Sequence, residues 1–77
     1  MPTIERIGDV KIQIYADDHE PPHFHLRAKG WSLWVDISTM KIERGKGPRG
    51  AADEALAWAR ANKAELMTKW REYNERD

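Results

Sequence analysis

All three histidines of the chain lie in one short segment, His19–Arg27, which has the sequence HEPPHFHLR. Pro21 and Pro22 separate the first histidine from the other two. His23 and His25 are two residues apart, so on a β-strand their side chains leave the same face, with alpha carbons about 7 Å apart. Imidazole binds transition metals, and it also exchanges protons near neutral pH. The segment therefore has the residue types of a metal site or of a catalytic site.

A metal site here would take His19, His23 and His25 as ligands, and zinc is a divalent transition metal that fits such a set. Glu20 and Asp36 are the carboxylates that can complete the site or orient a ring nitrogen. A coordination position left open to water would then allow metal-assisted hydrolysis.

The same histidines also fit catalysis without a metal. His19, His23 and His25 can act as general acid and base on a phosphodiester while Arg27 holds the phosphate, which would make the protein a ribonuclease-like hydrolase. A third interpretation needs no chemistry, because histidine on an exposed strand face can pack on a tyrosine or tryptophan and serve structure or recognition. Motif spacing alone leaves all three interpretations open.

The composition is that of a small soluble domain. The chain has 77 residues and no cysteine, which favours a single domain over residues 1–77 in a reducing cytoplasm. It contains neither a signal-peptide core nor an apolar run of membrane-spanning length, so no membrane partner is expected. Thirteen basic and thirteen acidic side chains cancel, and this argues against a protein whose binding is driven mainly by nucleic acid.

Hydrophobic periodicity predicts an α+β fold. Alternation with period two over residues 10–15, 23–29 and 31–37 indicates three strands, and a short fourth strand is expected near residues 40–44. We expect an antiparallel sheet over about residues 4–44 and two helices over about residues 48–74, packed on one sheet face. Pro48 suits a first helical position, and Asn62 suits the cap of the second helix.

The alternation also predicts which side chains each sheet face carries. One face is apolar and should be covered by the helices. The opposite face should stay open, and it would carry Tyr15, His23, His25, Arg27, Trp34 and Asp36. Aromatic residues are favoured at interfaces, so Tyr15, Trp34 and Asp36 are the candidate partner-binding residues. An edge strand and an open face can also pair two copies of the chain as a homodimer.

The stretch IYADDHEPPHFHLRAKGWSLWVDI resembles the signature of a family of very short bacterial proteins known as domain of unknown function 4160. The resemblance rests on Asp18-His19, on the PPHFH run from Pro21 to His25, and on the Val35-Asp36 step. A tryptophan near the end of the helical tail, here Trp70, also matches. The resemblance covers nearly the whole chain.

The resemblance implies a role as well as a fold. Genes of this family often lie beside a gene for another small protein, and the pair resembles a type II toxin–antitoxin module with this member as the toxin. We therefore expect a toxin-like protein that acts on RNA through the histidine cluster, and a small cognate antitoxin-like partner. The alternatives are a non-enzymatic protein-binding or regulatory module and a small metal-binding domain.

Overall fold

The computed structural model of the chain describes residues 3–16 and 21–74. Within these ranges the strands are β1 (Thr3–Ile7), β2 (Val10–Gln13), β3 (His23–Ala28), β4 (Trp31–Asp36) and β5 (Ile42–Lys46). The helices α1 (Asp53–Ala61) and α2 (Lys63–Asn74) follow. The predicted order of an antiparallel sheet followed by two helices is confirmed, but the sheet has five strands rather than three or four.

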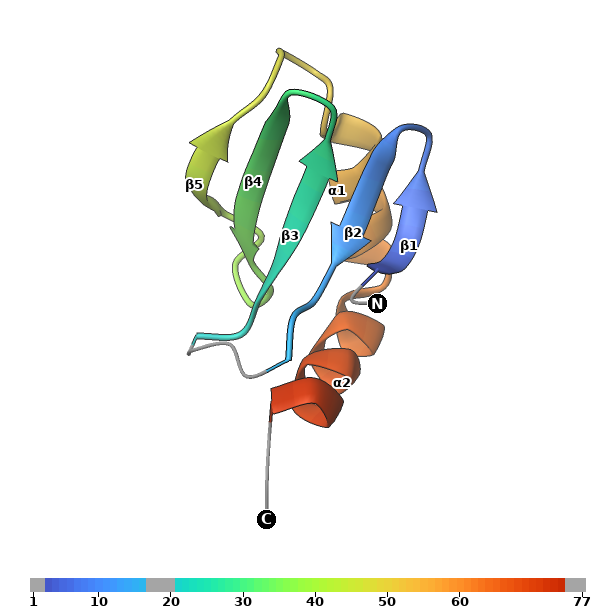
Figure 1. The fold of residues 1–77 in the computed structure, drawn as a ribbon. Coiled ribbons are helices and arrows are strands. Elements are labelled where there is room, and N and C mark those ends of the chain that lie inside the picture. The colour runs from blue at the N-terminus through green and yellow to red at the C-terminus, as the bar shows by residue number, and fades with distance from the viewer. Residues whose placement is uncertain (1–2, 17–20, 75–77) are drawn as a thin grey trace.

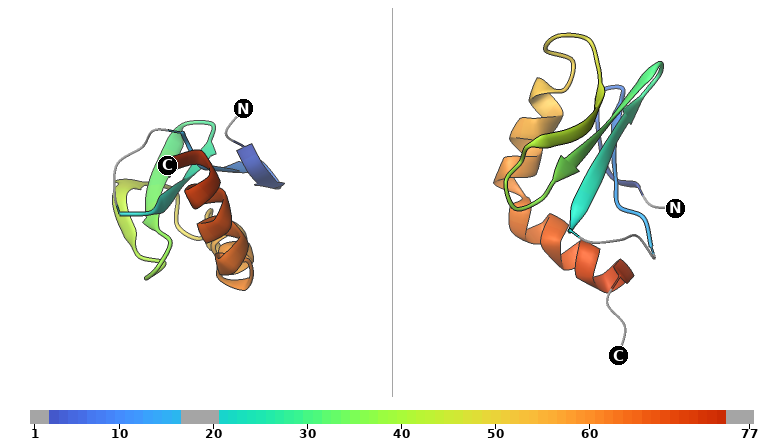
Figure 2. Two further views of the ribbon diagram at one scale, coloured as in Figure 1. Left: turned by 90° about the horizontal axis from the view of Figure 1, so that it is seen from below. Right: turned by 90° about the vertical axis from the view of Figure 1, so that its left-hand side faces the viewer.

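The five strands form an antiparallel meander in chain order, so each strand pairs with its neighbours along the chain. Both helices lie on one face of this sheet, and the other face is left uncovered (Figures 1 and 2). Helix α2 continues past the end of the sheet at which β2 ends and β3 begins (Figure 1). Neither described helix has both the length and the apolar character that a membrane-spanning helix requires.

The core lies between the sheet and the helices, as the alternation predicts. Period two places every second side chain of a strand on the helix-covered face. The buried side chains of that face are Val10, Ile12, Ile14, Phe24, Leu26, Leu33, Val35 and Ile37. Ala55, Ala59, Leu66 and Trp70 close the core from the helices.

Strand β1 is the strand that the hydrophobic pattern of the sequence does not predict. Its residues, TIERI, are exposed or only partly buried, because β1 lies at the sheet edge. An edge strand with little burial has a weak alternation pattern, so period two identifies it poorly.

The first helix begins later than expected. Pro48 lies in a turn before the helix, where its carbonyl accepts a hydrogen bond from the Ala51 N–H at 3.0 Å, and α1 begins at Asp53. Gly50 has φ of 79°, a left-handed conformation that ends any helix starting at Pro48. The second helix begins directly after Asn62, as predicted, but the Asn62 side chain donates to the Trp58 carbonyl at 2.9 Å instead of capping α2.

Candidate functional site

The strand register places the predicted site residues in neighbouring rows across the open face. His25 lies directly opposite Gln13 on β2 and Trp34 on β4, and Trp34 lies opposite Arg44 on β5. The next row toward the sheet end contains His23 opposite Asp36. The row on the other side contains Lys11, Arg27, Ser32 and Lys46.

His25 lies in the middle of this surface and is only partly buried. Its ring meets the ring of Tyr15 edge to face, with centroids 4.7 Å apart. The ring of His23 meets it in a similar way at 5.0 Å. These contacts fix the imidazole plane, and the Nε2 atom of His25 is buried, so a ligand would have to be contacted through Nδ1.

His23 differs from this pattern, because it is buried rather than exposed. Only 2% of its surface is accessible, and its ring lies 4.5 Å from that of Trp34 and 5.1 Å from that of Trp70. Trp70 reaches it because α2 extends past the sheet end, so His23 is covered at the tip of the sheet. The Nδ1–H donates to the Pro21 carbonyl at 2.8 Å, since a carbonyl oxygen only accepts.

Tyr15 links the histidine row to Arg27. The Tyr15 hydroxyl donates to Gln13 Oε1 at 2.7 Å and accepts from Arg27 Nη1 at 3.4 Å. The Gln13 amide in turn donates to Thr3 Oγ1 at 3.2 Å. Arg27 is itself exposed, so its guanidinium is held beside Tyr15 with donors facing solvent. An anion at this place would contact Arg27 within one row of His25.

Trp34 forms the floor of a hollow at the end of the open face. The hollow has a volume of about 380 Å3 and is lined by Pro21, His23, Trp34, Asp36, Glu43 and Arg44. The Arg44 guanidinium lies over the Trp34 ring, 5.0 Å from its centroid. Asp36 also serves the β4–β5 turn, since its Oδ1 accepts from the Thr39 N–H at 3.0 Å. The predicted partner-binding residues Trp34 and Asp36 thus line one hollow, and Tyr15 lies outside it.

The metal interpretation depends on residues outside this surface. Among residues 3–16 and 21–74, no three histidine or acidic side chains are grouped so that they can hold a metal ion. His19 and Glu20, which the sequence offers as a third ligand and a carboxylate, lie outside the described residues. In addition, the Nδ1 of His23 is engaged by the Pro21 carbonyl. The described residues therefore do not assemble a metal centre.

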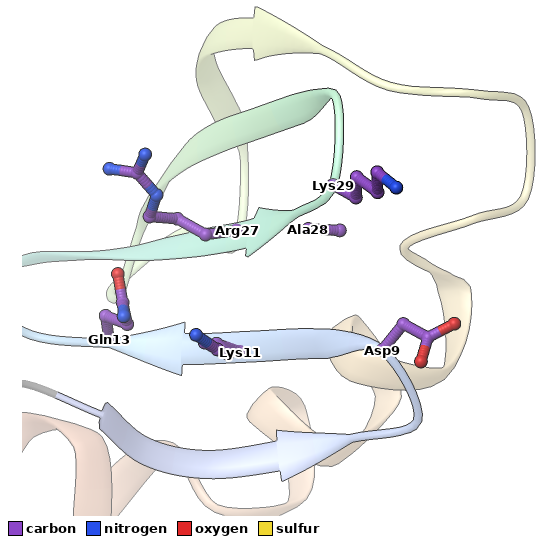
Figure 3. Close-up of a pocket in the computed structure, with 6 residues that line it drawn as sticks. All are labelled: Asp9, Lys11, Gln13, Arg27, Ala28 and Lys29. Carbon is purple, nitrogen blue, oxygen red and sulfur yellow. The ribbon is translucent and has the colours of Figure 1, made fainter.

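A second hollow contains residues that the site prediction did not include. It has a volume of about 340 Å3 and is lined by Asp9, Lys11, Gln13, Arg27, Ala28 and Lys29 (Figure 3). The alternation that placed Arg27 on the open face also places Lys11 there, so the signal was present in the sequence. Only the register Lys11↔Arg27 shows that the two cations are direct neighbours.

The family described as Domain of unknown function (DUF4160) matches residues 10–71, which is most of the chain. No curated protein and no solved structure matches the chain.

Proposed function

The chain belongs to the DUF4160 family, and we propose that it is the toxin-like member of a type II toxin–antitoxin pair and acts on RNA through its open sheet face. The role in such a pair comes from the resemblance of the PPHFH segment. The RNA chemistry comes from one observation on the open face: half-buried His25 and exposed Arg27 are joined through Tyr15. An imidazole beside a guanidinium is the pairing that phosphodiester cleavage needs.

In this proposal His25 is the general base, and it acts through Nδ1 because its Nε2 atom is buried. In the reaction it takes the proton of a ribose 2′-hydroxyl while that oxygen bonds to the adjacent phosphorus. The bond from phosphorus to the 5′-oxygen breaks, and the leaving oxygen takes a proton from water. Arg27 donates hydrogen bonds to the non-bridging oxygens, where negative charge accumulates. Tyr15 positions both groups through its ring and its hydroxyl. His23 supports the His25 ring from the buried side.

The cognate antitoxin would cover the same face. Tyr15 and Trp34 offer partly buried aromatic surface, and Arg44 stacks over Trp34. Aromatic and arginine side chains carry a large share of the binding energy at protein interfaces. A partner seated here would block His25 and Arg27 directly, which is how it would neutralise the activity.

The test is to express wild type and two variants, His25→Ala and Arg27→Gln, in a bacterial host and follow growth and RNA integrity. Loss of a general base usually lowers a rate by about 10²–10⁴-fold, so His25→Ala should relieve growth arrest and leave RNA intact. Ser32→Ala is the matched control, because Ser32 is exposed on the same face and opposite Arg27. RNA that is cut equally by wild type and His25→Ala would contradict the assignment.

A non-enzymatic binding module is the second candidate, and the burial of His23 favours it. A histidine that is 2% exposed and hydrogen-bonded to a backbone carbonyl serves structure, so the motif need not be catalytic. This function predicts that the wild-type protein binds its partner tightly while RNA stays intact. Co-purification with the product of the neighbouring gene, alongside an RNA degradation assay, separates the two functions.

A further inference from the structure

Cations of adjacent strands stand directly opposite one another on the open face. Arg6 on β1 lies opposite Lys11 on β2, and Lys11 lies opposite Arg27 on β3. In an antiparallel sheet, residues opposite each other have side chains on the same face about 5 Å apart. Ser32 continues the row on β4, and Lys46 lies opposite it on β5. We name Arg6, Lys11, Arg27 and Lys46 the cationic row.

This arrangement costs stability in the free protein. Like charges that face each other across strands repel, whereas opposite charges would attract. The ion pair found among the described residues is Lys69–Glu72 on α2, far along the chain from this row. Within the described part of the chain, no ion pair of the row's cations offsets their repulsion, and the acidic side chain that shares the hollow with Lys11 and Arg27 is Asp9. A negatively charged ligand would offset that repulsion.

The centre of the row opens into the hollow of Figure 3, where Lys29 joins Lys11 and Arg27. The three cations come from β2, from β3 and from the turn after β3. Gln13 lines the other end of the hollow, but its side chain is buried and already hydrogen-bonded to Thr3 and Tyr15. Asp9 also lines the hollow and forms no ion pair with these cations among the described residues. With three cations and one carboxylate on its lining, the hollow keeps a net positive charge that favours an anionic group.

The row next to it supplies aromatic rings. His25 and Trp34 lie one row away, which along a strand is about 7 Å, and Tyr15 bridges the two rows through its hydrogen bond to Arg27. These rings are partly exposed. A track of cations beside accessible rings is the pattern by which proteins hold single-stranded nucleic acids, with phosphates on the cations and bases against the rings. A duplex does not fit this pattern, because its bases are stacked inside.

We infer that the hollow of Lys11, Arg27 and Lys29 is a phosphate site for single-stranded RNA, and that the strand's bases lie against Tyr15 and Trp34. The inference rests on the proposed function for its choice of RNA and adds the substrate class. The phosphate held here is adjacent to the one that Arg27 presents to His25. The protein thus selects unpaired RNA before any cleavage step.

The experiment measures binding apart from cleavage. The probe is a fluorescein-labelled 2′-O-methyl RNA about ten nucleotides long, within the usual site size for such surfaces, and its blocked 2′-oxygens prevent cleavage. Fluorescence anisotropy at several salt concentrations compares wild type with Lys11→Gln/Lys29→Gln. Arg60→Gln/Arg71→Gln is the matched control, because it removes two exposed charges from the helices on the other face.

We expect wild type and control to bind alike and the Lys11→Gln/Lys29→Gln variant to bind more weakly. Each phosphate contact on a single strand contributes about 0.7 to the slope of log K against log salt, so losing two should lower the slope by about 1.4. This corresponds to about 25-fold weaker binding at 0.1 M salt, relative to a 1 M reference at which these contacts are screened. The same oligonucleotide as a duplex should bind more weakly to wild type.

The outcomes separate this inference from the proposed function. Equal affinity of wild type and the Lys11→Gln/Lys29→Gln variant, no binding by wild type, or preference for the duplex would each overturn the phosphate site. Binding as expected without cleavage of unmodified RNA by wild type would overturn the proposed catalysis and leave the site standing. If wild type cleaves unmodified RNA but the Lys11→Gln/Lys29→Gln variant binds the probe as tightly as wild type, the phosphate site would be overturned and the proposed catalysis would stand.

Discussion

The two strand histidines of the PPHFH segment should respond differently to truncation, because His23 is buried and His25 is only partly buried. The perturbation is His23→Ala compared with His25→Ala. His23 is 2% exposed, contacts the rings of Trp34 and Trp70, and donates a hydrogen bond to Pro21. Truncating a buried ring to alanine removes these contacts and leaves a cavity, at a cost of about 3 kcal/mol.

The cost for His25 is smaller because its side chain is only partly buried. It loses edge contacts with Tyr15 and His23, and an aromatic pair is worth about 0.5–1.5 kcal/mol. A domain of this size has a total stability of about 4–12 kcal/mol, and each kcal/mol moves Tm by about 4–8 °C. His23→Ala should thus lower Tm by about 12–24 °C. Two aromatic pairs of about 0.5–1.5 kcal/mol each should make the decrease for His25→Ala smaller, centred near about 2 kcal/mol or about 8–16 °C.

The assay is urea and thermal unfolding followed by tryptophan fluorescence, since Trp34 and Trp70 contact His23 directly. His23→Phe is the control, because it keeps a ring in the pocket and loses the hydrogen bond to Pro21, at a cost of about 1 kcal/mol. Equal losses for the two alanine variants would refute the assignment of His23 as a structural residue. The result also decides which variant reports on chemistry, because lost toxicity in an unfolded His23→Ala protein says nothing about catalysis.

Two further predictions concern the sheet. Lys11→Gln should raise the free energy of unfolding at low salt by about 0.5 kcal/mol, or Tm by about 2–4 °C, because Lys11 lies between Arg6 and Arg27. The gain should vanish in 1 M salt, which screens the repulsion. A lower Tm of the variant at low salt would contradict the repulsion. Gly45→Ala should destabilise the protein by more than about 1 kcal/mol, because Gly45 has φ of 94° and an added Cβ would meet the Ser32 carbonyl oxygen. Denaturation with urea checks the second prediction, and an unchanged midpoint would show that β5 moves freely at this position.

The sequence predicts the core well because the helices cover only one face of the sheet. Every second side chain of a strand is therefore buried, and this burial appears in the sequence as alternation. Val10, Ile12 and Ile14 repeat with period two and are all buried against the helices. The same pattern assigns His25 and Arg27 to the open face, and their positions on β3 confirm it.

The pattern fails at His23 for a tertiary reason. Period two places His23 on the same face as His25, and the register agrees. Its burial depends on α2 reaching beyond the sheet so that Trp70 contacts the His23 ring, and no local pattern in residues 23–28 contains that information. The position of His19 lies outside the described residues, so the three-histidine arrangement stays a prediction.

Net charge says little about one face of this chain, because it adds together side chains that lie on different faces. Thirteen basic and thirteen acidic side chains sum to zero, which argues against nucleic acid when the chain is treated as one number. The register gathers Arg6, Lys11, Arg27, Arg44 and Lys46 on the open face. The helices of the other layer carry four acidic and four basic side chains, so that layer is balanced; they are Asp53, Glu54, Glu65, Glu72, Arg60, Lys63, Lys69 and Arg71. Asp36, the acidic residue in the His23 row, has a carboxylate oxygen that accepts a hydrogen bond from the Thr39 N–H.

A ligand approaching the open face meets the local field of that face, since charges beyond about 10 Å are screened at ordinary salt. A neutral protein of this architecture can therefore bind a polyanion on one face, and the salt dependence of that binding measures the face rather than the whole chain.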